Sequence, residues 1–316
     1  MGPALILTVG QERSLPTKIN ASRNLRAVTF SANGKHLLSG GRDQNVQMWR
    51  VQNGQREATI EAKDVCCLAV SKNGKWIAGG GRKGEVFVWD AETYTTVWKH
   101  EEDSWISEDD DFSSDSWIIE DVDFSRDSVK LVSGSRNCTA TIWDVASGKR
   151  IRTLHHKQGL IAAKFSSDRN RIATATSQSV QVWDSKDGHL LFVDIPLTVP
   201  SLYNGLRWFN GHIFVISYNT IKQLDASTGS TVSEWPVPNS NNYSCIAVPR
   251  HDNFIAYSTS RSVTFWDTST HLQIGLVEHT EDIRSIALSL DNRSLVIGGC
   301  HGTIITEGLS HITVST

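Results

Sequence analysis

The stretch Val86-Phe87-Val88-Trp89-Asp90 ends in a pair that recurs along the chain and decides its fold. The Trp-Asp pair returns at three further positions, Trp143-Asp144, Trp183-Asp184 and Trp266-Asp267. Degenerate copies fill the other places of the series, at Trp49-Arg50, Leu224-Asp225 and Glu307-Gly308. Successive members lie 40, 54, 40, 41, 42 and 41 residues apart. A period near 40 residues indicates an array of units that each form one four-stranded sheet, and here it predicts seven of them.

The units share an internal register as well as a length. A run that ends in small residues precedes the pair, at 38–41, 77–80, 131–135 and 295–299. An alternating run precedes that, and a turn such as Asn33-Gly34 or Asn73-Gly74 follows it. Period-two alternation that ends in Asn-Gly predicts hairpins. Small residues on the second strand would let neighbouring sheets approach closely.

With this register the chain resembles the WD40-repeat family over nearly its whole length. The resemblance implies an all-β fold, a seven-bladed WD40 β-propeller of four-stranded antiparallel blades, closed by N- and C-terminal strands that share a blade. We expect one domain over 1–316, with repeats near 20–60, 61–99, 115–154, 155–193, 200–235, 240–277 and 278–316. The closing strand is expected in 14–19 or in 4–9. The alternative is a segment cut from a longer array.

The resemblance also implies structural roles for the repeated residues. The tryptophans should pack between blades, namely Trp49, Trp89, Trp143, Trp183 and Trp266. The aspartates with structural roles are Asp90, Asp144, Asp184, Asp225 and Asp267. Many family members add a buried network of His, Ser or Thr, Asp and Trp in each blade. Here only His156 and His279 fill the His position, and neither has a matching Asp, so no blade carries the full network.

The long spacing of 54 residues has its own explanation. Residues 103–116 read DSWISEDDDFSSDS and residues 115–128 read DSWIIEDVDFSRDS, with 11 of 14 positions identical at an offset of 12. The second copy is predicted to form the first strand of blade three, because it has Ile119 and Val122 where the first copy has Ser107 and Asp110. Burying Asp110 without a partner would cost several kcal/mol. The duplicated residues 103–114 are therefore expected to form an insertion between blades two and three.

This insertion is acidic, since 101–123 contains eleven Asp and Glu and no Lys or Arg. The candidate binding residues in it are Trp105, Asp109, Asp110, Asp111 and Phe112. Three interpretations stay open: a solvated insertion, a partner-binding or autoinhibitory element, and a calcium site. The calcium interpretation is the weakest, because the run lacks the glycine turn and the spaced ligands of a calcium loop.

Three arginines form a second candidate site. Arg42, Arg82 and Arg136 stand seven residues before the repeated Trp in blades one to three, and Lys83 follows Arg82. The resemblance places this position on the binding face, beside the central channel. Either these are solvated turn residues paired with nearby acids, or they bind an acidic or phosphorylated peptide through planar guanidinium groups. The acidic insertion could then occupy the same site in cis.

The composition limits the classes of partner that this protein is expected to bind. The net charge of −3 and the pI near 6.4 give no overall basic field, so nucleic acid is not an expected partner. The apolar runs are too short to cross a membrane, so no membrane partner is expected. The five cysteines show no metal-ligand spacing, so we expect reduced thiols and neither metal nor cofactor.

No motif of a catalytic site occurs in the sequence. We therefore expect a monomeric, non-catalytic scaffold for protein–protein interaction, with a protein or peptide partner, in the cytoplasm or alternatively in the nucleus. The other interpretation is a ligand-sensing or carbohydrate-binding propeller, or a module of a larger signalling protein. For sugar binding, the candidate stacking residues are Trp208, Trp235 and Tyr243.

Overall fold

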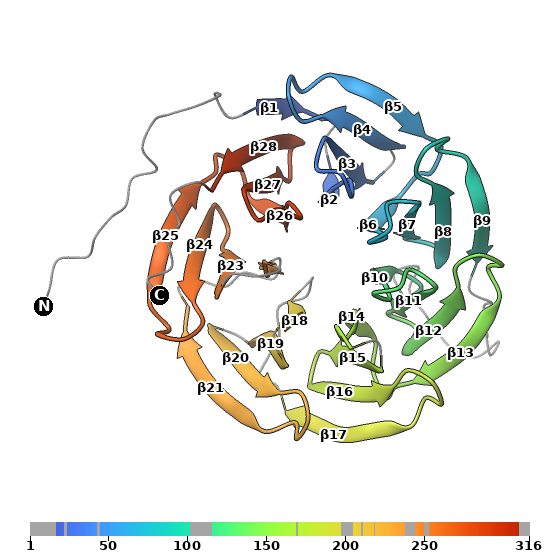
Figure 1. Ribbon diagram of the computed structural model, residues 1–316, viewed down its shortest axis with the longest axis vertical. Helices are drawn as coiled ribbons and strands as arrows, with labels where there is room; N and C mark the ends of the chain where they lie inside the picture. The colour runs from blue at the N-terminus through green and yellow to red at the C-terminus, as the bar shows by residue number, and fades with distance from the viewer. Residues whose placement is uncertain are drawn as a thin grey trace, which may run out of the picture.

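Seven four-stranded antiparallel sheets stand around one axis in the computed structural model, which confirms the expected seven-bladed propeller (Figure 1). The structure describes residues 17–21, 24–42, 45–101, 116–168, 170–196, 205–209, 211–217, 219–237, 244–249 and 253–309; the side chains of Thr17 and of 193–196 are not described. Within these ranges the regular elements are all strands.

Blades one to four use consecutive strands. Blade one consists of β2 (Leu25–Phe30), β3 (His36–Gly41), β4 (Val46–Arg50) and β5 (Arg56–Ile60). Blade two consists of β6 (Val65–Val70), β7 (Trp76–Gly81), β8 (Glu85–Asp90) and β9 (Thr96–Glu101). Blade three consists of β10 (Ile119–Phe124), β11 (Lys130–Ser135), β12 (Thr139–Asp144) and β13 (Arg150–His155). Blade four consists of β14 (Leu160–Phe165), β15 (Arg171–Thr176), β16 (Ser179–Asp184) and β17 (Leu190–Pro196).

The second half of the ring repeats this plan until its last blade. Blade five consists of β18 (Leu206–Phe209), β19 (His212–Ser217), β20 (Thr220–Asp225) and β21 (Thr231–Pro236). Blade six consists of β22 (Ile246–Ala247), β23 (Phe254–Ser258), β24 (Ser262–Asp267) and β25 (Gln273–Glu278). Blade seven consists of β26 (Ile283–Leu288), β27 (Ser294–Gly299), β28 (Thr303–Gly308) and, from the other end of the sequence, β1 (Thr17–Asn20).

The ring closes because β1 pairs antiparallel with β28 as the outermost strand of blade seven (Figure 1). The register matches Thr17 with Thr306 and Asn20 with Thr303. Of the two segments expected to close the ring, 14–19 overlaps the observed strand, which begins at Thr17 and extends to Asn20. This pairing covers the free edge that β28 would otherwise present to solvent.

The second copy of the duplicated sequence supplies β10, the first strand of blade three. Ile119 and Val122 are both fully buried there, as the alternation in this copy predicted. The first copy, 103–114, lies outside the described residues.

Glycines on the second strands allow the blades to approach each other. A Cβ added to Gly80 on β7 would lie 2.6 Å from the sulfur of Cys67 and would also overlap Ile119 of the next blade. A Cβ on Gly298 of β27 would meet Leu25 and Val28 across the joint between blades seven and one. The small residues at these positions therefore serve close packing between sheets, as expected.

A β-bulge near the start of the first strand is shared by blades one, two, three, four and seven. In blade three the register shifts between Ile119 and Asp121, so that Glu120 is the extra residue. The corresponding extra residues of the other four blades are Arg26, Cys66, Ile161 and Arg284. A bulge re-aims the side chain of the extra residue, and at functional sites this is often its use.

Four of the five repeated tryptophans are buried in the core. Trp49, Trp89, Trp143 and Trp183 are buried, and Trp266 is half-buried. The five cysteines are free thiols. Cys67 is buried whereas its neighbour Cys66 is half-buried, which is consistent with side chains on opposite faces of β6.

Candidate functional site

The aspartates of the repeated pairs cap turns, and this explains their repetition. Asp90 Oδ1 accepts backbone N–H groups from Glu92 and Thr93 at 2.9 and 2.8 Å. Equivalent bonds from the second or third following residue reach the other four, Asp144, Asp184, Asp225 and Asp267. Backbone hydrogen bonds from Thr93 and Glu92 hold the pKa of Asp90 below its ordinary value. These carboxylates are therefore engaged by the turn between the third and fourth strands.

The buried network is most nearly complete in blade four. Thr174 Oγ1 accepts the indole N–H of Trp183 at 2.9 Å and lies 2.9 Å from Nε2 of His156. Blade two is at the other extreme: Trp89 packs against Gly79, and its buried indole N–H has no acceptor among the described residues. In blade two the network therefore lacks even the bond from the tryptophan to the second strand.

The three arginines occupy equivalent places in neighbouring blades. Each follows the second strand of its blade, and its backbone N–H donates to the carbonyl of the residue immediately before the first strand. The N–H groups of Arg42, Arg82 and Arg136 reach the carbonyls of Asn24, Asp64 and Ile118 at 3.1, 3.1 and 3.0 Å. These turns lie where the first strands begin, and we call this side of the ring the arginine end.

The exposure of these cations differs from one blade to the next. Arg42 and Lys83 are exposed, and Arg82 and Arg136 are half-buried. Arg136 is engaged, because its Nε lies 2.5 Å from Oε1 of Glu120. Arg136 is therefore paired with a carboxylate of its own blade.

Glu120 is the residue that sequence reasoning missed at this end. It is the extra residue of the β10 bulge and is only 4% exposed. Burial raises the pKa of its carboxyl to about 7, although Arg136 and Arg26 act in the opposite direction. Its position inside the acidic run of the duplication concealed it, since that run reads as solvated surface.

Trp105, Asp109, Asp110, Asp111 and Phe112 all lie outside the described residues, so the expected contact in cis remains a prediction. Of the aromatic residues considered for sugar stacking, Trp235 is 4% exposed and stacks on His271 with ring centroids 4.3 Å apart. Tyr243 lies outside the described residues, and Trp208 belongs to the pocket considered next.

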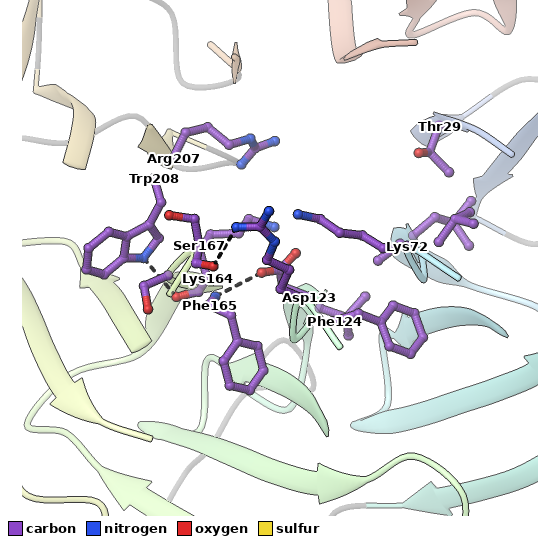
Figure 2. A pocket seen from close by; sticks show the side chains of 15 residues that line it. Thr29, Lys72, Asp123, Phe124, Lys164, Phe165, Ser167, Arg207 and Trp208 are labelled. Atoms are coloured by element: carbon purple, nitrogen blue, oxygen red, sulfur yellow. Dashed lines mark hydrogen bonds between the residues drawn. The ribbon is translucent and has the colours of Figure 1, made fainter. Parts of the chain in front are cut away.

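A pocket of about 330 Å³ lies where the first strands end (Figure 2). It is at the opposite end of the axis from the arginines, which lie where these strands begin. A six-residue strand rises about 20 Å, which separates the two ends. Four cationic side chains line the pocket, Lys72, Arg126, Lys164 and Arg207. Figure 2 shows Lys72 and Arg207 extending toward each other across it. We call this side of the ring the pocket end.

The charged residues of the pocket come from two sets of equivalent positions, one on the first strands and one in the turns that follow them. Asp123, Lys164 and Arg207 face the third residue of the second strand in their hairpins, so they hold the same position in blades three, four and five. Lys72 and Arg126 hold the same place in the turns after β6 and β10. In blades one and two, the position of Asp123 is taken by Thr29 and Ala69.

The carboxylates near the pocket are held by the protein itself. Asp121 forms an ion pair with Lys164, 2.6 Å from Oδ1 to Nζ, and accepts the backbone N–H of Ala163 at 3.0 Å. Asp123 accepts the backbone N–H of Phe165 at 2.8 Å. Burial raises the pKa of the Asp123 carboxyl, with Lys164 opposing that shift. Among the described residues that line the pocket, cations therefore outnumber acids.

This pocket was not anticipated from the sequence, although a signal for it exists. Asp123 and Lys164 each stand two residues before the Ser that opens the turn after the first strand. Aligning the repeats on that Ser, instead of on the Trp, brings the charged positions of neighbouring blades together.

Neither a metal cluster nor a spanning helix is found in the described part of the chain. No group of three or more His, Cys, Asp and Glu side chains could hold a metal ion there. No helix among the described residues is long and apolar enough to cross a membrane.

Comparison with known proteins identifies the family of this propeller. A family model described as nucleolar protein 10-like, N-terminal domain, matches residues 11–211. No curated protein matches the chain.

Three solved structures share the architecture. The structure of U3-55K is 16% identical with a TM-score of 0.73, and the match covers 91% of this chain and 96% of the other. The crystal structure of the RRP9 WD40 repeats is 16% identical with a TM-score of 0.73, and the match covers 90% of this chain and 94% of the other. A chain of the mitotic checkpoint complex is 17% identical with a TM-score of 0.79, and the match covers 98% of this chain and 99% of the other. At these identities the matches establish the fold alone.

Proposed function

Because this chain belongs to the nucleolar protein 10-like family of β-propellers, we propose that it is a non-catalytic scaffold for protein–protein interaction that works in the nucleus. The family description favours the nucleus over the cytoplasm, which the sequence alone had suggested first. A structural neighbour that is part of the mitotic checkpoint complex is an example of this fold within a protein assembly.

The arginine end is the proposed binding surface, and its partner is an acidic or phosphorylated peptide. The observation that carries this proposal is the equivalent placement of Arg42, Arg82 and Arg136 by matched backbone hydrogen bonds in three consecutive blades. Regular spacing of guanidinium groups suits an extended chain with several anionic groups, because each planar fork can bind a carboxylate or a phosphate. Lys83 adds a point charge beside Arg82.

Arg42, Arg82 and Lys83 would supply most of the attraction in this arrangement. Arg136 is already shared with Glu120 at 2.5 Å, so it offers the peptide fewer donors. Since burial raises the pKa of Glu120 to about 7, protonation of that carboxyl would loosen the pair. The peptide should then bind more tightly below neutral pH, provided that its own phosphates remain charged.

A fluorescently labelled peptide with two phosphoserines among glutamates tests the proposal by anisotropy. We expect the double variant Arg42→Glu with Arg82→Glu to weaken binding about tenfold or more. The matched control is Arg56→Glu with Lys149→Glu, which changes the net charge by the same amount. Arg56 lies on the outer strand β5 and Lys149 just before the outer strand β13, and both are exposed. This control should bind the peptide as the wild type does.

Salt provides the second readout. Raising the ionic strength should weaken the peptide complex, because exposed ionic contacts are screened. Equal affinities for the two double variants would contradict the proposal, as would an affinity that salt leaves unchanged. Binding on a carbohydrate array would favour the sugar-binding interpretation instead.

A further inference from the structure

We propose that the pocket end binds a compact ligand carrying at least two phosphate groups, independently of the peptide surface at the arginine end. The pocket volume of about 330 Å³ lies within the range of small-molecule sites. Its size suits a small polyphosphate better than a protein segment.

The cations of the pocket come from four consecutive blades. Lys72 belongs to blade two, Arg126 to blade three, Lys164 to blade four and Arg207 to blade five. They therefore surround a common space along an arc of the ring, instead of forming a single row. Such an arc can bind phosphates on different sides of one compact molecule, which a flat basic patch on a single sheet could not do.

The hydrogen bonds within the pocket leave donors for a ligand. Arg126 Nη1 donates to the carbonyl of Ser167 at 3.3 Å, and Arg207 Nη1 donates to the carbonyl of Leu206 at 2.8 Å. Each guanidinium has five N–H donors, so these bonds orient the groups without exhausting them. Figure 2 shows the Arg207 side chain directed into the pocket.

The acids of the pocket do not cancel this charge. Asp121 is taken by Lys164 and the N–H of Ala163, and one oxygen of Asp123 accepts the N–H of Phe165. Lys164 lies 12% exposed in its ion pair, so it serves chiefly to set the local field. Lys72, Arg126 and Arg207 then supply the contacts to phosphate.

Three aromatic residues line the pocket, namely Phe124, Phe165 and Trp208. Phe124 and Phe165 are buried, so the half-buried Trp208 is the one whose surroundings decide between a compact ligand and single-stranded RNA. RNA that binds without base pairing needs aromatic faces on which its bases stack. The indole N–H of Trp208 donates to the carbonyl of Lys164 at 3.0 Å. The guanidinium of Arg171 lies over its ring, 5.5 Å from the centroid. Trp208 is therefore already stacked within the protein and is a poor platform for bases.

Calorimetric titration of the whole chain with inorganic tripolyphosphate tests this inference. We expect one ligand per chain, and a dissociation constant about tenfold or more higher in the double variant Lys72→Gln with Arg126→Gln. Both residues are exposed and lie in turns, so the variant should fold. The matched control is Lys35→Gln with Lys75→Gln, two exposed residues near the same end that do not line the pocket; it should bind as the wild type does.

Three further arms separate the sources of phosphate and the two ends of the ring. Inositol hexakisphosphate should compete with tripolyphosphate, whereas a single-stranded RNA of twelve nucleotides should not. The variant Arg42→Glu with Arg82→Glu should keep its tripolyphosphate affinity, so that failure of the peptide proposal would leave this one standing. The inference is overturned by absent tripolyphosphate binding, by equal losses in the pocket and control variants, or by binding of the RNA alone.

Discussion

Buried carboxylates at the two ends of the ring have different hydrogen-bond partners, although they are neighbours in sequence. At the arginine end, Glu120 is buried against the guanidinium of Arg136, and no backbone N–H bond to it is described. Toward the pocket end, Asp121 and Asp123 each accept a backbone N–H of β14. Glu120 and Asp121 are consecutive in sequence, and the bulge between Ile119 and Asp121 separates their surroundings. The comparison teaches that consecutive buried carboxylates are held differently, Glu120 by a cation and Asp121 by a cation together with a backbone donor.

The largest effect should follow removal of Asp121. The substitution Asp121→Ala leaves Lys164 without its 2.6 Å partner at 12% exposure and frees the N–H of Ala163. Breaking a buried ion pair by deleting one member costs about 3 to 5 kcal/mol. We therefore expect a loss of that size in the free energy of unfolding, measured by urea denaturation.

Ser285 offers a matched control for this experiment. Its hydroxyl accepts the N–H of Val28 at 3.1 Å across the joint between blades seven and one, and it follows the bulge as Asp121 does. The substitution Ser285→Ala removes a neutral hydrogen bond and should cost only about 1 kcal/mol. Equal losses for the two substitutions would mean that the ion pair adds nothing to the interblade bond.

The next effect is a pH dependence that comes from Glu120. Burial raises the folded-state pKa of its carboxyl from 4.5 to about 7, so between these values the folded chain holds a proton that the unfolded chain has released. Stability from this group is therefore full below the lower pKa and is lost as the pH rises to the higher one. The loss amounts to about 3 kcal/mol.

Glu120→Gln should remove this dependence. Denaturation curves at pH 5 and pH 8 give the difference in unfolding free energy between wild type and variant at each pH. We expect the wild type to lose up to about 3 kcal/mol of unfolding free energy relative to the variant as the pH rises. A difference that stays constant between the two conditions would show that the carboxyl titrates at its ordinary value.

The smallest effect should come from Arg42, the exposed one of the three arginines. Arg42→Ala removes an exposed side chain and leaves the backbone bond to Asn24 in place. We expect a change in unfolding free energy within about 0.5 kcal/mol, with peptide binding weakened. A larger loss of stability would place Arg42 among the residues that support the fold and would blur its use as a binding probe.

The architecture could be predicted because it rests on repetition. The Trp89-Asp90 pair and its copies fixed the number of blades, and the apolar Ile119 and Val122 identified the first strand of blade three. The closing strand was located only in part, because a short run such as Thr17–Asn20 carries little periodicity of its own.

The sites were harder to anticipate because their residues repeat only after the strands are aligned. Lys164 and Arg207 share a position that no dipeptide marks, and one of their blades has lost its Trp-Asp pair. The environment of Glu120 depends on a bulge, and a bulge leaves no trace in alternation alone. Charge runs in sequence therefore predicted where acids are dense, and not which of them are buried.

The pairing of β1 with β28 has a mechanical consequence. Thr17, at the start of β1, lies opposite Thr306, close to the end of β28. A pulling force applied at these two points would break the hydrogen bonds one after another from that side, with no two of them sharing the load. The ring should consequently open under tension at blade seven by peeling, at a lower force than strands pulled in shear would resist.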